Sequence, residues 1–406
     1  SLSLDANTTA SSNTAVGSSS LGANTTGSNN TATGFYSLEA NTTGTQNSAV
    51  GSYALALNTT GGYNIALGVN SLYYNTAGSY NTGLGVSALQ SNTTGDNNTA
   101  SGHAASYSNT TGGQNTSSGY KALYFNTTGS DNTAFGKDAL KANTTASNNT
   151  AVGRNALYAN TTGADNVAVG LSTLYYNTTG HSNTAVGKDA LQSNTTGTSN
   201  TGTGYRAGLG VTTGYSNTLI GYRAGYYSTD ITTGTKNVIV GAYSRASSAT
   251  AIAAIGIGYD INAGAGYTTV GQSSSDIRAA HGVATWNTVS DERYKKDIVD
   301  STAGLSFVNA LQPRTFKYKN LGELPTTFNA YEEGSTEVFK NSNTNHGFIA
   351  QEVKAAINAD SSIKDGFKMW DDRDDGSQEV AEAALIPVLV KAIQELSAKN
   401  EALLTR

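Results

Sequence analysis

Apolar and polar residues recur with a fixed period of 17 over roughly the first 240 residues. The repeating unit is N-T-T-G-x-x-N-T-A-V-G-x-x-A-L-x-x, with an apolar residue before the second glycine and a leucine four residues after it. The tripeptide N-T-T, once N-T-A, starts at Asn7 and occurs 12 times at steps of 17, the last at Asn194. Two degenerate copies follow at Val211 and Ile231, a step of 20. So short a fixed period is typical of a solenoid, in which each repeat packs only on its neighbours.

Each repeat predicts two short strands and two turns. Asn, Thr and Gly disfavour a helix, and no 3.6-residue pattern is present. N-T-A-V-G predicts one strand closed by the glycine, the segment around A-L predicts a second strand, and N-T-T-G predicts the turn between coils. Fourteen coils, each advancing about 4.8 Å, would make a rod on the order of 65 Å long.

Disorder is the competing interpretation, because the repeats are polar and of low complexity. A disordered segment requires neither an exact repeat length nor an apolar residue at one fixed position of the repeat. The residue before the glycine is Val, Leu, Ile or Phe in 10 of 14 copies. The repeat therefore favours an ordered solenoid.

The two Asn positions of the unit have different interpretations. The second (Asn13, Asn30 and onward at steps of 17) predicts an internal ladder of side-chain amides bonded from coil to coil. The first begins a glycosylation sequon in 11 copies. A turn explains the same residue without sugar, since Asn tolerates left-handed backbone.

Twenty of the 23 tyrosines precede Ser290, where they would either bind glycans or pack between neighbouring chains.

The interior of one coil is thin. Each repeat offers only two or three apolar side chains, so a roll made by a single chain would be marginal. Three chains wound about one axis would bury both faces and cover the open edges. We therefore expect a homotrimer, although the repeat by itself does not determine the number of chains.

Charge divides the 406 residues into two parts. The first 289 carry 20 charged side chains and the last 117 carry 33, which takes the net charge to -5. This shift predicts a β-solenoid rod over 1–244, a neck over 245–289 and a small α+β domain over 290–406. The fold class is thus mainly β. The mild acidity gives no reason to expect nucleic-acid binding, and no apolar run reaches the roughly 20 residues of a membrane helix.

Few residues suggest a cofactor or a metal. The chain has no cysteine, which excludes disulfides, thiolate metal sites and a cysteine nucleophile. The histidines are scattered without metal-ligand spacing. An acidic loop could bind a cation or simply be solvated. No cofactor and no metal are expected. These histidines are His103, His181, His281 and His346, and the loop acids are Asp371, Asp372, Asp374 and Asp375.

The last 117 residues contain four sequence blocks in a fixed order. They are V-S-D-E-R-Y-K-K-D-I at 289–298, L-Q-P-R at 311–314, H-G-F-I-A-Q-E-V at 346–353 and A-L-I-P-V-L-V-K-A-I-Q-E-L at 384–396. This combination resembles the intramolecular chaperone domain of the endosialidase type, which ends many phage tail fibres and tailspikes. The 17-residue array is more loosely similar to repeats of phage fibres and to the head repeats of trimeric autotransporter adhesins.

The resemblance implies a domain that promotes trimerisation and then cuts itself off. The motif serine and lysine become Ser290 and Lys295, with the scissile bond between Ser290 and Asp291. A Ser-Lys pair is a known variant of nucleophile and base. Its lysine must be neutral, which needs desolvation or nearby positive charge, and Arg293 and Lys296 would help to supply that charge. The alternative for this segment is a solvated run of charges.

The C-terminal segment predicts a helix with a heptad seam. Pro387 suits its first turn. The seam has a polar Asn400 at an a position, which can set register between parallel chains in a coiled coil. Packing of the seam against its own domain is the alternative. The seam residues step by 3, 4, 3, 4 and 3: Ile386, Leu389, Ile393, Leu396, Asn400 and Leu403.

These features indicate a structural fibre of a phage tail. It would be a virion component that contacts other tail proteins and a host-surface glycan or protein receptor, and it would act as a protease only on its own chain. A bacterial trimeric surface adhesin with the same terminal domain is the alternative. A glycan-degrading tailspike is disfavoured, because the first 289 residues hold ten acids and no obvious catalytic pair.

Overall fold

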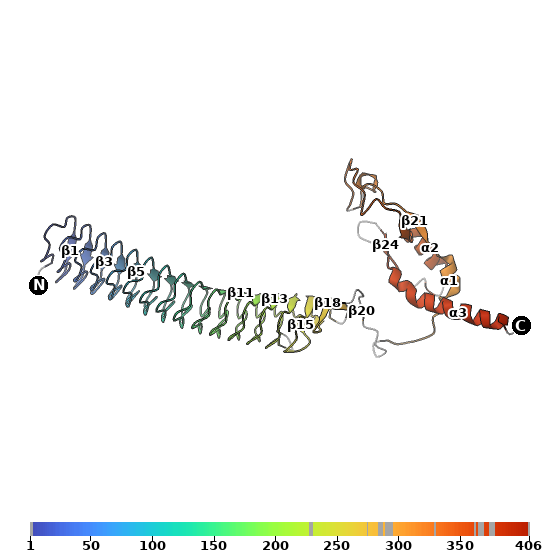
Figure 1. Ribbon diagram of the computed structural model, residues 1–406, viewed down its shortest axis with the longest axis horizontal. Coiled ribbons are helices and arrows are strands. Elements are labelled where there is room, and N and C mark those ends of the chain that lie inside the picture. Colours follow the sequence, from blue (N-terminus) through green and yellow to red (C-terminus); the bar gives the residue numbers. More distant parts are fainter. Residues whose placement is uncertain are drawn as a thin grey trace. The chain divides into compact units, whose positions relative to one another are not determined.

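The computed structural model describes residues 3–226, 230–273, 275–282, 287–288, 295–328, 330–360, 363, 369–372 and 378–404. The chain divides into two compact units, Ser1–Ser290 and Asp291–Arg406. The first is a β-solenoid of about 15 turns, and the second is a small domain that ends in a long helix (Figure 1). The expected fold class, mainly β with a 17-residue solenoid and a small C-terminal domain, is confirmed.

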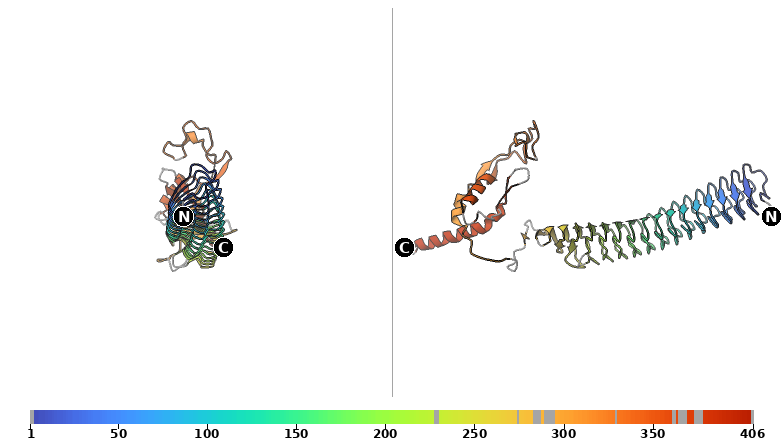
Figure 2. Two further views of the ribbon diagram at one scale, coloured as in Figure 1. Left: turned by 90° about the vertical axis from the view of Figure 1, so that its left-hand side faces the viewer. Right: turned by 180° about the vertical axis from the view of Figure 1, so that it is seen from behind.

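One three-residue strand per coil builds the parallel ladder of the solenoid. Thr14 lies beside Thr31 and Ala15 beside Ala32, and the ladder spans the insertion where Thr218 lies beside Val238. Seen from the end, the coils lie one behind another (Figure 2). The strands are β1 (Thr14–Val16), β2 (Thr31–Thr33), β3 (Ser48–Val50), β4 (Ile65–Leu67), β5 (Thr82–Leu84), β6 (Thr99–Ser101), β7 (Thr116–Ser118), β8 (Thr133–Phe135), β9 (Thr150–Val152), β10 (Val167–Val169), β11 (Thr184–Val186), β12 (Thr201–Thr203), β13 (Thr218–Ile220) and β14 (Val238–Val240).

The interior of the solenoid is closed by a single chain. From β2 onward the middle residue of the strand is buried, and in most coils a leucine 11 residues before it fills the interior beside it, as Leu191 does beside Gly202. Ala32, Leu38, Ala49 and Leu55 are all fully buried. The thin interior is completed by asparagine side chains rather than by a neighbouring chain. Burial of the interior therefore does not by itself require a trimer.

In the coils before residue 226 the second strand expected in each repeat is not formed, so the prediction is wrong for them; a two-residue strand at this position first appears at Arg245–Ala246. Around A-L the chain makes turns, because two residues per coil take left-handed backbone: Ser19 has φ 60° and Leu21 has φ 51°. The same pair recurs in later coils, for example Tyr53 and Leu55 at 58° and 51°. Left-handed leucine is rare because its Cβ crowds the backbone. It persists here because each leucine is buried and its N–H donates to the next coil, as Leu21 does to the carbonyl of Ser37 at 3.1 Å.

Both Asn positions of the repeat form buried ladders. At the second position, the side-chain oxygen of Asn30 accepts from the backbone N–H of Asn47 at 3.0 Å, which confirms the expected amide ladder. At the first position, Asn41 Nδ2 donates to Asn24 Oδ1 at 2.8 Å and to the carbonyl of Gly44 at 3.0 Å. These first-position side chains are fully buried from Asn24 onward. An amide engaged twice in the interior has no room for a glycan, so the structure favours the structural role.

The tyrosines pack mainly against aromatic rings of neighbouring coils of their own chain. Tyr158 and Tyr175 stack at 4.9 Å with an interplanar angle of 3°, and Tyr107 and Tyr124 stack at 5.1 Å. The two roles expected from the sequence were glycan binding and packing between neighbouring chains, whereas this packing lies within one chain. Stacking covers part of each ring, but the side chains are not all buried: Tyr80 stacks on Tyr63 at 4.8 Å and is 57% exposed.

The parallel ladder continues past residue 244 and then ends in an antiparallel hairpin. The edge of the last parallel strand is thereby covered, which blocks further pairing there. β14 pairs with β16 (Ile255–Tyr259) and β16 with β18 (Tyr267–Gln272), all parallel, whereas β19 (Ser275–Ala280) runs antiparallel to β18 and to β20 (Asn287–Thr288). A smaller parallel pair joins β15 (Arg245–Ala246) to β17 (Asn262–Ala263).

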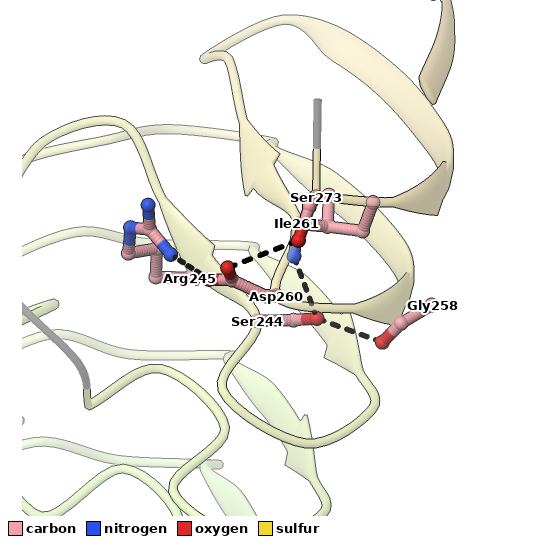
Figure 3. Close-up of polar contacts among 6 residues, drawn as sticks. All are labelled: Ser244, Arg245, Gly258, Asp260, Ile261 and Ser273. Atoms are coloured by element: carbon pink, nitrogen blue, oxygen red, sulfur yellow. Dashed lines mark hydrogen bonds and ion pairs between the residues drawn. The ribbon is translucent and has the colours of Figure 1, made fainter. Parts of the chain in front are cut away.

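Polar contacts tie these last coils together (Figure 3). Asp260 receives hydrogen bonds from Arg245 at 2.6 Å and from the hydroxyl of Ser273 at 3.1 Å. The hydroxyl of Ser244 donates to the carbonyl of Gly258 at 2.8 Å and accepts from the N–H of Ile261 at 3.1 Å. The C-terminal end of the solenoid is thus held by charged and hydroxyl groups where the Asn ladders stop.

The second unit packs three helices around one apolar cluster. The cluster contains Phe307, Val353, Met369 and Val388, all buried. The elements are α1 (Leu305–Ala310), β21 (Arg314–Phe316), the 3-10 turn η2 (Leu321–Glu323), β22 (Asn345–Gly347), α2 (Ala350–Ala359), β23 (Trp370–Asp372), β24 (Gln378–Val380), η3 (Glu382–Leu385) and α3 (Ile386–Leu404); β21 pairs with β22 and β23 with β24, both antiparallel.

Candidate functional site

The terminal helix turns its heptad seam away from its own unit. Ile393 on the seam is 66% exposed, whereas Val388 on the opposite face is 3% exposed and joins the core. Within the described residues the seam does not pack against its own unit, which contradicts that alternative. Pro387 lies in the first turn of α3, as expected. The exposed seam residues are Ile386, Leu389, Ile393, Leu396, Asn400 and Leu403.

An ion pair joins two of the sequence blocks in the second unit. Arg314, from the L-Q-P-R block at the start of β21, binds Glu352 of α2 with two hydrogen bonds, Nε to Oε2 at 3.0 Å and Nη2 to Oε1 at 2.7 Å. The hydrogen bonds from Arg314 hold the pKa of Glu352 below its ordinary value. The sequence alone does not pair these two blocks, because 38 residues separate the two side chains.

A second polar contact connects α1 to α3. The backbone N–H of Leu305 donates to Glu395 Oε2 at 3.0 Å. Gly304 permits this approach, since a Cβ at that position would lie 2.5 Å from the other carboxylate oxygen. The carboxylate satisfies a donor at the start of α1 that has no partner within the helix. This contact anchors α3 and so orients the exposed seam.

The expected self-cleavage residues lie at the junction of the two units. Ser290, Asp291 and Arg293 fall outside the residues that the structure describes. Lys295 and Lys296 are described, and both side chains are exposed. The boundary between the units falls between Ser290 and Asp291. The geometry of a Ser-Lys pair is therefore not part of the described structure.

The weaker candidates gain no support. Within the described ranges, no group of three or more His, Asp or Glu side chains is placed to hold a metal ion. Asp371 and Asp372 belong to β23, while Asp374 and Asp375 fall outside the described residues. Among the described helices, none is long and apolar enough to cross a membrane.

Comparison with known proteins identifies one similarity. Residues 290–360 match the model of a family described as the chaperone of endosialidase. This family consists of self-cleaving intramolecular chaperones, so the match supports autoproteolysis. Neither a curated protein nor a solved structure matches the chain. The match and the 17-residue solenoid together fit a tail fibre with a C-terminal chaperone.

Proposed function

We propose that this chain is the structural fibre of a phage tail, built as a homotrimer that is aligned by its second unit and then cut between Ser290 and Asp291. The fibre belongs to the virion, joins other tail proteins and contacts a receptor on the host surface. The observation that carries the proposal is the family match, which begins at Ser290 directly after the solenoid.

The repeat explains why such a fibre needs an aligning domain. Successive coils present the same residue types at the same backbone positions, as in the pairs Ala32–Ala49 and Ala168–Ala185. Two chains shifted by one coil would make almost the same contacts, so the rod specifies its own register weakly. A domain with a unique sequence supplies the missing register.

The exposed seam of α3 is the feature best suited to join three copies. Leucine and isoleucine at heptad spacing bury one another when parallel helices meet, and a polar residue such as Asn400 favours the register that pairs it with its copies. A second apolar row, on the outer face of the strands, would then bring the rods together. Its most exposed members are Val16, Val50, Leu67 and Phe135.

Assembly would also activate the cut. A lysine acts as a base only when it loses its proton, and burial favours the neutral form. Lys295 is exposed in the single chain. Neighbouring copies in the trimer would bury it and so make cleavage follow assembly. Removal of the second unit then makes assembly irreversible, because the released rods no longer carry the aligning domain.

Expression of the full chain tests the proposal. Denaturing electrophoresis should show pieces of about 290 and 116 residues. Ser290→Ala and Lys295→Ala should each leave the chain whole while light scattering still shows trimers, and Lys317→Ala, which removes an exposed lysine elsewhere in the second unit, serves as the control. Cleavage that persists in both variants would show that Ser290 and Lys295 are not the nucleophile and base. A soluble, aligned trimer made from residues 1–290 alone removes the chaperone role.

A further inference from the structure

Cationic side chains gather on one side of the solenoid. Between residues 103 and 223 every lysine and arginine lies in the turn segment that runs from the strand-closing glycine to the next N-T-T. We call this surface the basic face. Its cations are Lys121, Lys137, Lys141, Arg154, Lys188, Arg206 and Arg223.

Backbone hydrogen bonds stack these residues coil on coil. The carbonyl of Lys137 accepts from Asn155, that of Arg154 from Ser172 and that of Lys188 from Arg206, each at 3.0 Å. Equivalent positions in successive coils are therefore about one strand spacing, or 4.8 Å, apart. Lys137 and Arg154 occupy equivalent positions in neighbouring coils, and Lys188 occupies the same position two coils after Arg154. These three residues form one column along the solenoid.

Acidic groups do not neutralise this column. The basic face contains two carboxylates: Asp138 pairs with Lys141 at 3.2 Å and Asp189 with Arg206 at 3.4 Å. Lys137, Arg154 and Lys188 are exposed, and no ion pair to them occurs among the described residues.

Aromatic rings hold several of the cations in place. The Lys137 ammonium lies 5.7 Å from the ring centre of Tyr120, and that of Lys188 lies 5.7 Å from that of Tyr205. Such cation–π contacts restrain an ammonium group without neutralising its charge. Two of the three cations of the column, Lys137 and Lys188, are thus restrained at their positions along the solenoid.

We propose that the basic face binds a linear acidic polysaccharide, with its carboxylates on Lys137, Arg154 and Lys188. The proposal rests on the proposed host-surface role of the fibre and gives its ligand a chemical class. Uncompensated cations in a straight line complement a regularly charged chain laid along the axis. Tyrosine hydroxyls around the column add hydrogen-bonding groups for sugar hydroxyls.

A nucleic acid fits this surface less well. Single strands are bound on exposed aromatic faces that stack with bases. The rings at the two ends of this column are covered instead: Tyr120 stacks on His103 at 5.5 Å and Tyr205 on Tyr222 at 5.2 Å. The ammonium groups of Lys137 and Lys188 lie over the same two rings, so their faces are less available to bases.

Binding of polygalacturonate by the full chain tests the proposal, measured at several salt concentrations beside a neutral glucan and double-stranded DNA. We expect salt-sensitive binding of polygalacturonate only. The Lys137→Gln/Arg154→Gln/Lys188→Gln variant should lose on the order of a hundredfold in affinity. The dependence of log affinity on log salt should become shallower by about three units.

The double variant Lys236→Gln/Arg278→Gln is the matched control, because it removes exposed cations elsewhere in the first unit and should leave binding unchanged. Equal affinity of the triple variant, equal binding of the neutral glucan, or equal or tighter binding of DNA would each overturn the proposal. Trimer formation and self-cleavage, measured on the same preparations, report separately on the proposed fibre function.

Discussion

Gly208 and Leu219 fill the interior of the solenoid with the small and the large residue in reversed positions. Most other coils have a leucine where Gly208 stands and an alanine where Leu219 stands. In a typical coil a leucine such as Leu157 faces the alanine 11 residues later, Ala168, and both are fully buried. At Gly208 the leucine is missing, and a Cβ there would lie 2.6 Å from Leu219 Cδ1. Leu219, together with Leu191, whose Cδ2 would lie 2.7 Å from that Cβ, therefore fills the space that a leucine side chain would take.

This exchange predicts strong coupling between the two positions. Leu219→Ala should cost about 2–5 kcal/mol by leaving a cavity, and Gly208→Leu about 1–3 kcal/mol by overpacking. The double variant restores the usual pair and should be more stable than either single variant. Backbone strain is no obstacle, since Gly208 has φ 62° and Leu191 at the equivalent position has 48°. Urea unfolding followed by circular dichroism provides the double-mutant cycle.

Ala168→Leu is the control for overpacking, because its coil already contains Leu157. It should destabilise the solenoid with no compensating partner. Strictly additive effects at positions 208 and 219 would show that the two side chains do not share one space.

The buried Asn ladder predicts a large penalty for a charge at its centre. Asn109 Nδ2 donates to Asn92 Oδ1 at 2.8 Å and to the carbonyl of Gly112 at 2.9 Å, while its Oδ1 accepts from Asn126 at 2.8 Å. Asn109→Asp replaces the donors by an acceptor and should cost about 3 kcal/mol or more. Thermal unfolding of the full chain measures it. Exposed Asn97→Asp is the control, and an equally small effect of both changes would contradict the ladder.

The 17-residue period predicted most of the solenoid correctly. The prediction failed around A-L, where a strand was expected and the chain makes turns. T-A-V followed by glycine predicted the strand correctly, since β-branched residues and a regular inward alanine suit one stacked strand. Leu21 belongs to the A-L segment that was expected to form a second strand, and leucine rarely adopts the positive φ that it has here. Only the stacking of coils, which buries Leu21 and bonds its N–H, outweighs that preference.

The sequence blocks predicted which segment holds the candidate site, but they did not predict the contacts within it. The order of the blocks pointed to the segment that matches the chaperone family. The contacts that organise the second unit, Arg314 with Glu352 and Leu305 with Glu395, join residues 38 and 90 positions apart. No local pattern reports such pairs. The heptad of α3 was visible, but its exposure required knowledge of which face the core occupies.

The exposed seam predicts that trimers depend on α3. Ile393→Lys/Leu396→Lys should abolish trimers, because two charges would meet their copies in an apolar seam. Both side chains are exposed, so the second unit should keep its fold. Light scattering measures the chain number and circular dichroism the fold. Ala398→Lys adds a charge to an exposed position outside the seam and should leave the trimer intact; a trimer that tolerates the seam variant refutes the seam contact.

The ion pair of Arg314 and Glu352 predicts how the second unit responds to acid. The folded pKa of Glu352 is depressed, chiefly by the hydrogen bonds from Arg314. Its contribution to stability is therefore fully present above the unfolded pKa of about 4.3 and is lost as the pH falls through the folded value. Glu352→Gln should lower stability modestly at neutral pH and flatten the decline below about pH 4. Urea unfolding between about pH 3 and pH 7, with Glu333→Gln as an exposed control, measures both effects. A decline in acid that is equally steep in the Glu352→Gln variant would mean that other carboxylates govern the response.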